Sequence, residues 1–396
     1  MLLQLHGRTL RPLTAISDAP FIGRICERPD VGPADRGRDI LLVRSTLEKL
    51  PEGFSAYLMQ VDDRVQRDDR RNVFALAPEM HYLADGDVVR LDPRRCSLTA
   101  LYRRNSPSNS FLMTERCDNY CVMCSQPPKE RDDSWLLEEL RTVVPLISKE
   151  TVEIGITGGE PTLLGEGLVA FVEQLRDELP ATALHILSNG RRFADAAFAK
   201  RLAAVRHPDL MLGIPLYSDV ADEHDYVVQA RGAFSETVRG ILNLKQHRVR
   251  VELRFVIHAD TYARLPEFAQ FLARNLLFVD HVALMGLEPT GFAKSNLYAL
   301  WIDPLEYGRQ LSDAVRTLDR AGMSVSIYNH QLCVLDPALH QFARKSISDW
   351  KSMYVDECDG CAKRDDCGGF FASSTSHRST GIRRLGWPET TPAGTD

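Results

Sequence analysis

The sequence predicts an α/β protein with a small β domain before the α/β part and a short cysteine-rich module after it. Residues 109 to about 330 alternate six short apolar runs with amphipathic helical stretches. Residues 1–108 contain β-like runs that no long amphipathic helix interrupts. Residues 331–396 contain four cysteines but too little apolar periodicity to form a core of their own.

The N-terminal β domain is predicted from three short runs that are rich in β-branched and aromatic residues. They are Ile40–Val43, Phe54–Val61 and Val88–Leu91, and Asp85-Gly86-Asp87 supplies a turn before the last of them. No constellation of chemically active residues stands out in this part of the chain, so its role is not predicted.

The central part is predicted to form a parallel sheet with right-handed crossovers. The strands are expected at Ser110–Met113, Val152–Ile156, Leu184–Leu187, Leu210–Ile214, Val249–Ile257 and Val282–Leu287. The helices are expected at Ser134–Leu146, Leu168–Leu179, Asp195–Val205, Phe234–Lys245 and Leu265–Leu276. In such sheets the chemistry lies at the carboxyl ends of the strands, and the motifs below all follow predicted strands.

Composition excludes several classes of protein. The formal net charge of −6 provides no overall basic field that would attract nucleic acid. Four arginines lie within Arg64–Arg71, but Asp68 and Asp69 offset them, and this segment is predicted to be a solvated loop. No run of about 18 apolar residues predicts a membrane span. The first six residues do not resemble a signal peptide, so we expect a cytoplasmic protein, with a disordered tail after Trp387.

Cysteine usage points to metal. Thiols stay reduced in the cytosol, and seven of the nine cysteines fall into two tight groups. The other two, Cys26 and Cys96, are expected to be small buried apolar residues.

The first cysteine group is a CxxxCxxC loop, Cys117, Cys121 and Cys124, directly after the first central strand. Three thiolates can hold three corners of a [4Fe–4S] cluster and leave one iron open. An open iron can chelate the amino and carboxylate groups of S-adenosylmethionine (SAM) and pass an electron to its sulfonium, which yields a 5′-deoxyadenosyl radical. The alternative is a structural zinc site, although such sites usually have four ligands and CxxC pairs.

Three strand ends provide candidate SAM contacts. Gly158 and Gly159 allow close backbone approach, and Glu160 or nearby carbonyls can accept the SAM ammonium. Ser188, Asn189 and, less directly, Ser218 follow the third and fourth strands and can bind ribose hydroxyls, although each is also an ordinary turn residue.

The fifth strand alternates apolar residues with charged ones, which places Glu252 and Arg254 on the inner face of the sheet if the apolar set faces the helices. We predict that Arg254 binds the SAM carboxylate. The alternative is that both residues are structural and form salt bridges to neighbouring strands. Glu288, which closes the sixth strand, is a further guess for a substrate-facing residue.

The second cysteine group is Cys358, Cys361 and Cys367 together with the upstream Cys333. Four thiolates saturate a second [4Fe–4S] cluster, which we favour because the chain already provides a first one. A zinc ribbon is the alternative.

With these residues in view, the chain resembles the radical SAM superfamily over residues 110 to about 290, through the CxxxCxxC loop and the GGEPT turn at 158–162. The C-terminal cysteines resemble SPASM/twitch auxiliary-cluster modules. More narrowly, the chain resembles radical SAM maturases of the HxsC type from His-Xaa-Ser systems. That closer likeness rests on Cys117–Pro128, Gly286–Ala293, Ser346–Lys351 and Cys367–Phe371.

The resemblance implies a partial (β/α)6 barrel of the TIM type and SAM as cosubstrate. It also implies a ribosomally made precursor peptide with His-Xaa-Ser repeats, a sister radical SAM maturase, and a reductant such as flavodoxin or ferredoxin. Two positions depart from the pattern: Met123 stands where an aromatic residue is commonest, and Phe371 stands where a full SPASM domain has a further cysteine. We therefore expect one auxiliary cluster.

The predicted function is that of a radical SAM peptide maturase, with no residue assigned as acid, base or nucleophile. Two alternatives stay open. One is a radical SAM enzyme acting on a small metabolite or tRNA, and the other is a zinc-stabilised binding protein without catalysis.

Overall fold

The structure is a computed structural model, and it describes residues 10–13, 19–30, 32, 36–45, 49–60, 72–345, 353–375 and 377–386. The sequence predictions for the first residues, for Arg64–Arg71, for Ser346–Lys351 and for the tail from Trp387 fall outside these residues. Within them, no helix has the length and apolar character needed to cross a bilayer.

The N-terminal part forms a mixed seven-stranded sheet in the order β1-β5-β4-β3-β2-β6-β7. Its strands are β1 (Leu10–Pro12), β2 (Phe21–Cys26), β3 (Asp39–Val43), β4 (Ala56–Met59), β5 (Val73–Leu76), β6 (Val88–Asp92) and β7 (Ser97–Tyr102). Alternate residues of the central strands enter two separate apolar clusters, so both faces of the sheet are buried. The predicted small β domain is confirmed.

The central part forms a second seven-stranded sheet whose neighbouring strands are all parallel and follow chain order. Its strands are β8 (Asn109–Leu112), β9 (Glu153–Thr157), β10 (Ala183–Leu187), β11 (Leu210–Pro215), β12 (Arg250–Ile257), β13 (His281–Gly286) and β14 (Val325–Tyr328). The six predicted strands correspond to β8–β13. The seventh, β14, was not predicted and extends the sheet beyond them.

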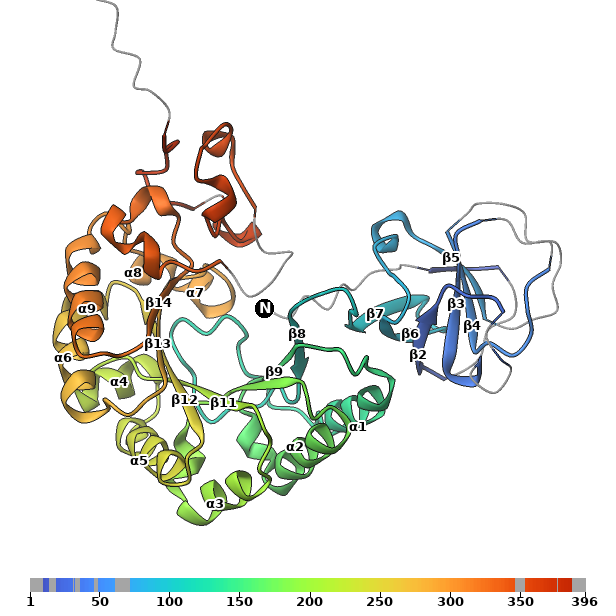
Figure 1. Ribbon diagram of the computed structural model, residues 1–396, viewed down its shortest axis with the longest axis horizontal. Coiled ribbons are helices and arrows are strands. Elements are labelled where there is room, and N and C mark those ends of the chain that lie inside the picture. The colour runs from blue at the N-terminus through green and yellow to red at the C-terminus, as the bar shows by residue number, and fades with distance from the viewer. Residues whose placement is uncertain are drawn as a thin grey trace, which may run out of the picture.

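The longer helices cover the convex face of this sheet (Figure 1). They are α1 (Trp135–Val143), α2 (Glu166–Glu178), α3 (Ala196–Ala204), α4 (Ala221–Val228), α5 (Ala233–Gln246), α6 (Leu265–Asn275) and α9 (Gly308–Arg320), with the short α7 (Gly291–Ser295) and α8 (Leu297–Leu300) in between. The largest apolar core lies between these helices and the sheet, and includes Val251, Leu253, Phe255 and Ile257 of β12. The outward orientation predicted for the apolar residues of this strand is therefore correct.

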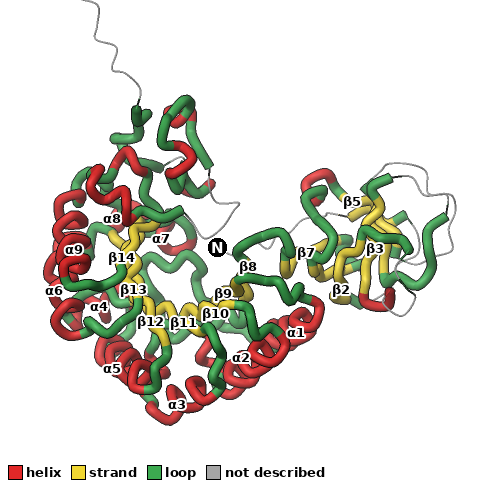
Figure 2. The backbone as a smooth tube through the Cα atoms, in the orientation of Figure 1, coloured by secondary structure: helices red, strands yellow, loops and turns green. Residues whose placement is uncertain are grey.

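The sheet curls into an arc and does not close, which is the predicted partial barrel (Figure 2). Among the described residues no pairing joins the edge strands β8 and β14. Because all strands run in one direction, their carboxyl ends meet at one end of the arc, and the loops that follow them gather there.

The N-terminal sheet contacts the barrel near the amino ends of its first strands. Arg90 forms an ion pair with Glu139 of α1 at 2.7 Å, and the hydroxyls of Tyr102 and Thr151 lie 2.7 Å apart. Thr151 precedes β9, so these contacts lie away from the carboxyl ends. The division of the chain at residues 108 and 330 stays a prediction.

The C-terminal module contains no α-helix among residues 353–375 and 377–386. It consists of the short 3-10 helices η9 (Asp356–Cys358), η10 (Arg364–Asp366) and η11 (Ala372–Ser374), and one isolated bridge between Met353 and Phe370.

Candidate functional site

The CxxxCxxC loop lies across the carboxyl ends of the central strands. Its backbone is bonded to two other elements: the Val122 N–H donates to the Val227 carbonyl of α4 at 2.9 Å, and the Phe292 N–H of α7 donates to the Cys124 carbonyl at 2.8 Å. The loop is therefore held in place by the chain, whether or not a metal is bound.

The three cysteines of this loop are half-buried, and their charges act on one another. Burial, together with the charges of Glu160, Asp118 and Cys124, raises the pKa of Cys117 to about 12, although the Asn119 N–H that donates to the sulfur at 3.4 Å lowers it in part. Burial and the charges of Cys124 and Cys117 also raise the pKa of Cys121. Such thiols stay protonated at neutral pH unless a cation binds them, so this donor set fits a metal cluster.

The Gly158-Gly159 turn packs directly against the segment that leads into the loop. The N–H groups of Gly159 and Glu160 donate to the carbonyls of Thr114 and Arg116, each at 2.8 Å. A Cβ on Gly158 would lie 2.5 Å from the Thr114 oxygen, and one on Gly159 would lie 2.1 Å from the Arg116 oxygen. The close approach that the two glycines allow is thus to the chain itself, whereas the sequence suggested an approach to a ligand.

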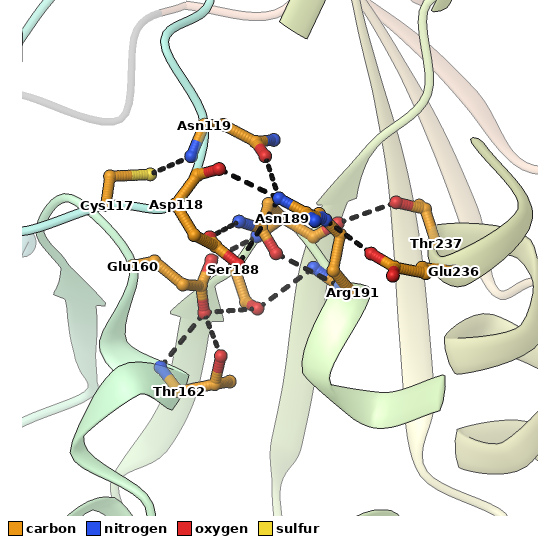
Figure 3. A network of polar contacts seen from close by, with 11 residues as sticks. Cys117, Asp118, Asn119, Glu160, Thr162, Ser188, Asn189, Arg191, Glu236 and Thr237 are labelled. Atoms are coloured by element: carbon orange, nitrogen blue, oxygen red, sulfur yellow. Dashed lines mark hydrogen bonds and ion pairs between the residues drawn. The ribbon is translucent and has the colours of Figure 1, made fainter. Parts of the chain in front are cut away.

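Glu160 is the centre of a buried polar network (Figure 3). Its side chain is almost wholly enclosed, at 1% exposure, and burial raises its pKa. One carboxylate oxygen accepts from the Thr162 N–H at 2.9 Å, the Thr162 hydroxyl at 2.5 Å and the Ser188 hydroxyl at 2.8 Å; the other accepts from the Asn189 N–H at 2.6 Å. Glu160 therefore ties the end of β9 to the end of β10.

Asn189 and Arg191 connect this network to the cysteine loop (Figure 3). The Asn189 amide donates to Asp118 at 2.6 Å, and Arg191 donates to the Asp118 carbonyl at 2.8 Å and to the Asn119 side chain at 2.7 Å. The Arg191 guanidinium also donates to the carboxylate of Glu236 of α5 at 2.6 Å. The sequence analysis missed Asp118, Arg191 and Glu236, because no local pattern pairs residues that are 45 to 73 positions apart.

Ser218 and Arg254 are less directly connected to the loop. The Ser218 hydroxyl is buried and donates to Glu223 at 2.6 Å. Arg254 lies on the inner face of β12, as expected, where it donates to Glu252 at 3.0 Å and to the Met285 sulfur at 3.3 Å. Glu252 and Arg254 pair with each other within β12, whereas the structural alternative expected salt bridges to neighbouring strands. The thioether leaves the outer end of the guanidinium weakly bonded.

Two further residues support the loop and were not singled out from the sequence. Gly291 has a φ of +53°, and a Cβ there would lie 2.4 Å from the Cys124 carbonyl oxygen. Asp133 is buried and accepts from the Thr114 hydroxyl at 2.8 Å and from Arg116 at 3.1 Å. Both hold the chain on either side of the cysteines.

The second cysteine group gathers loosely at the C-terminal module. Burial raises the pKa of Cys333, and the charges of Cys367 and Cys358 raise it further, so the three thiols are near enough to interact. The Leu385 N–H donates to the Cys361 sulfur at 3.4 Å. In the part of the chain that the structure describes, no three His, Cys, Asp or Glu side chains are close enough to hold a single metal ion. That holds for both groups; a [4Fe–4S] cluster spreads its thiolates over separate irons.

The C-terminal module also contacts the end of β13. The Ser373 hydroxyl donates to Glu288 at 3.4 Å, and the Gln331 amide donates to the Gly369 carbonyl at 2.8 Å. Glu288 therefore lies between the barrel and the module. Its contact with a substrate stays a prediction.

Comparison with known proteins finds similarities that centre on the barrel. Residues 111–272 match the family model of the Radical SAM superfamily. The chain is 28% identical over 198 residues to a GTP 3′,8-cyclase of Desulforamulus reducens, covering 48% of this chain and 58% of the cyclase. It is 27% identical over 171 residues to an Fe-coproporphyrin III synthase of Methanosarcina barkeri, covering 40% and 39%.

Among solved structures, Streptococcus suis SuiB bound to S-adenosylmethionine superposes with a TM-score of 0.46 at 14% identity, over 57% of this chain and 51% of SuiB. The chain spans about half the length of the curated relatives it matches. The cysteine loop at 117–124 and the GGEPT turn at 158–162 both lie within the matched residues 111–272, so this part of the chain is similar to the radical SAM superfamily.

Proposed function

We propose that this protein is a radical SAM enzyme that modifies a ribosomally made peptide. Cys117, Cys121 and Cys124 would hold a [4Fe–4S] cluster that, when bound, reduces SAM to methionine and a 5′-deoxyadenosyl radical. The observation that carries the proposal is the placement of these thiols, in a loop bonded to α4 and α7, beside the Glu160 network at the carboxyl ends of β9 and β10.

The SAM site is assigned to Gly158, Gly159, Glu160, Ser188, Asn189, Ser218 and Arg254. Of these, the outer end of the Arg254 guanidinium, which donates to the Met285 thioether, has hydrogen-bonding capacity left. The side chains of Ser188 and Asn189 are bonded within the protein, to Glu160 and Asp118. Ribose hydroxyls would have to share or displace those bonds, while the network keeps both strand ends in position.

A second [4Fe–4S] cluster is assigned to Cys333, Cys358, Cys361 and Cys367. Its placement beside Glu288, through the Ser373 contact, suits electron exchange with a substrate held at the carboxyl ends of the strands. The zinc alternative predicts the same four ligands, and elemental analysis of the purified protein separates the two.

A peptide is the favoured substrate for two reasons. The first is the resemblance to HxsC-type maturases. The second is that the sheet stays open between β8 and β14, while the contacts of the N-terminal sheet described above lie near the amino ends of the strands. An open edge admits a chain that a closed barrel would exclude. A precursor peptide with His-Xaa-Ser repeats, a sister maturase and a flavodoxin or ferredoxin reductant complete the proposal.

The test is an anaerobic reaction of the iron-loaded protein with SAM, dithionite and the His-Xaa-Ser precursor peptide. We expect 5′-deoxyadenosine by chromatography and a mass change in the peptide, with the sister maturase added in a parallel reaction. 5′-Deoxyadenosine without any change in the peptide in either reaction would favour the small-metabolite or tRNA alternative. Zinc in place of iron, with no SAM cleavage, would favour the binding protein.

A further inference from the structure

Tyr217 lies at the carboxyl end of the central sheet, two residues after β11 ends at Pro215. Its ring stacks on His224 of α4, with the ring centroids 5.9 Å apart and the planes at 21°, and it lies against Phe255 of β12 with centroids 6.4 Å apart. The Tyr217 N–H also donates to Nδ1 of His224 at 3.1 Å. Contacts with α4 and β12 therefore set the direction of the phenol ring without any ligand.

The hydroxyl of Tyr217, in contrast, is free. In the part of the chain that the structure describes, it has no hydrogen-bond partner. A buried phenol hydroxyl usually finds one. This hydroxyl is not among the polar atoms that are both unpaired and fully enclosed, as Nε2 of His185 and Nε2 of His258 are. The residue keeps 9% of its surface exposed, so the hydroxyl borders open space in which a ligand can reach it.

That open space lies beside the cysteine loop. Tyr217 belongs to a small apolar cluster that includes Met123, and Cys121 packs against the same cluster. Burial raises the pKa of Tyr217, and the charges of Cys121 and Cys124 also raise it, whereas the charge of Arg254 lowers it. Since such effects weaken with distance, the phenol lies near both the loop thiols and the Arg254 guanidinium. It also stays protonated at neutral pH, so it can donate a hydrogen bond.

Arg254 offers a second donor to this space. One terminal nitrogen of its guanidinium donates only to the Met285 sulfur, a weak acceptor, at 3.3 Å. Ser218, the other polar side chain directly after β11, is already bonded to Glu223 of α4. Tyr217 and Arg254 thus provide a hydroxyl and a guanidinium with donors left. Such a pair fits a ligand that has a negative charge and two acceptor oxygens, which describes a carboxylate.

We propose that Tyr217 is a further SAM-binding residue, whose hydroxyl donates to one carboxylate oxygen of the methionine moiety while Arg254 donates to the other. This inference rests on the proposed function, because SAM is the carboxylate ligand assigned to this end of the barrel. The two donors come from neighbouring strands whose register pairs Pro215 with Arg254, so the sheet sets their spacing. The same carboxylate is expected to chelate the open iron, so Tyr217 would orient SAM towards the cysteine loop as well as bind it.

The experiment measures SAM binding to the iron-loaded protein by anaerobic equilibrium dialysis, without a reductant, so that no turnover occurs. Tyr217→Phe keeps the ring and removes only the hydroxyl. Loss of a hydrogen bond to a charged group should weaken SAM binding by roughly 10- to 100-fold. Decarboxylated SAM lacks the acceptor group, so the variant and the wild type should bind it equally. A merely structural role of the hydroxyl would weaken the binding of both ligands alike.

Two further variants sharpen the comparison. Arg254→Gln should show the same selective loss of SAM binding. The double variant should lose less than the product of the two single losses, because both side chains hold one carboxylate. Tyr226→Phe is the matched control, since Tyr226 lies on α4 with 60% of its surface exposed. We expect it to bind both ligands as the wild type does.

Equal SAM affinity of Tyr217→Phe and the wild type would overturn the assignment, as would an equal loss for SAM and its decarboxylated form. A shift of the cluster's reduction potential in the absence of SAM, with unchanged SAM affinity, would show that the hydroxyl bonds a cluster sulfur and would also overturn it. The selective loss together with an unmodified peptide would uphold the assignment and contradict the proposed peptide substrate. A wild-type protein that binds no SAM would overturn both.

Discussion

The two cysteine groups of this protein are held in different ways. The loop of Cys117, Cys121 and Cys124 is fixed by backbone bonds to α4 and α7, by the glycine turn, and by Arg191. The module of Cys358, Cys361 and Cys367 has only 3-10 helices and one isolated bridge among its described residues. None of the apolar clusters is centred there; Cys367 and Leu385 merely pack against the edge of the barrel core.

The comparison suggests that the first site is ordered before metal binds, whereas the second depends on metal for its fold. Bonds within the chain already order the first loop, so cluster binding loses little further conformational entropy there. It can therefore leave the fold of the barrel unchanged. The module has less such support, from side-chain contacts such as those of Ser373 with Glu288 and Ser379 with Asp303, and metal–ligand bonds would provide much of its folding free energy. The predictions below test this contrast, beginning with the largest effect.

Replacing Cys117, Cys121 and Cys124 together by Ala should abolish SAM cleavage, because the open iron loses all of its protein ligands. Iron should remain only at the second site. Since the loop is bonded through its backbone, circular dichroism and the barrel's melting temperature should change little. Retained 5′-deoxyadenosine formation would refute the cluster assignment, and collapse of the barrel would refute the preorganised loop.

Replacing Cys358, Cys361 and Cys367 together by Ala should have the opposite effects, on the fold of the module and not on SAM cleavage. Iron content should fall by half while SAM cleavage persists, and the module should become sensitive to protease. Limited proteolysis with mass spectrometry would locate the cuts within residues 353–386. Unchanged protection of that region would show that the module folds without metal.

The sequence predicted the barrel well because its strands carry a signal that tertiary context does not reverse. β9 to β13 are runs rich in Ile, Leu and Val between polar turns, and both faces of the sheet are covered, by helices outside and loops inside. β14, which was missed, is only four residues long, Val325–Tyr328; it pairs with β13 and forms one bridge from Ile327 to Ala343. The segment is a strand because it pairs with β13, and the sequence does not specify that pairing.

The residues of the candidate site also divide into those that the sequence predicted and those that it did not. The cysteines and the glycine turn were found because their spacing within a few residues identifies them. Arg191 was missed because its partner Asp118 comes from another βα unit, which only the fold brings close. Asp133 was missed because its partner Thr114 lies 19 residues away, at the other end of the connection between β8 and α1. Ser218 shows a further limit of the sequence pattern. Its hydroxyl donates to Glu223, and the position of a serine at a strand end does not predict that local contact.

Gly291→Ala tests the support of the first loop by α7. The substitution combines strain at a φ of +53° with a clash at the Cys124 carbonyl. We expect a loss of unfolding free energy of about 1–2 kcal/mol from the conformation and another ~1–3 kcal/mol from the clash. Reconstituted iron at the first site should fall as well, measured by absorbance near 400 nm.

Gly165→Ala is the matched control, because Gly165 has a nearly identical φ of +54° and no atom within 4 Å of its ideal Cβ. It should carry the conformational strain alone and leave iron content unchanged. Equal loss in the two variants would show that the Gly291 contact does not support the loop.

Asp303→Asn should produce the smallest effect, confined to the second group. Asp303 accepts from the Ser379 hydroxyl at 2.5 Å and from the Thr380 N–H at 2.9 Å, and so anchors the segment whose Leu385 N–H donates to Cys361. The amide keeps the size but removes the charge and one acceptor oxygen, which should weaken the anchor by about 1 kcal/mol.

The measurement for Asp303→Asn is metal release to a chelator. The second site should lose metal several-fold faster in this variant, while the first site and overall melting stay unchanged. Burial alone would raise the pKa of Asp303, but the hydrogen bonds of Ser379, Leu305 and Thr380 lower it. A lowered pKa means that the anchor is fully present above the ordinary value near 4 and is lost only as the pH falls through the lower one. The difference between variant and wild type should therefore be constant from pH 8 to about 5. The exposed Asp313→Asn, on α9, should match the wild type throughout, and equal release rates in all three proteins would show that the C-terminal segment does not secure the second metal.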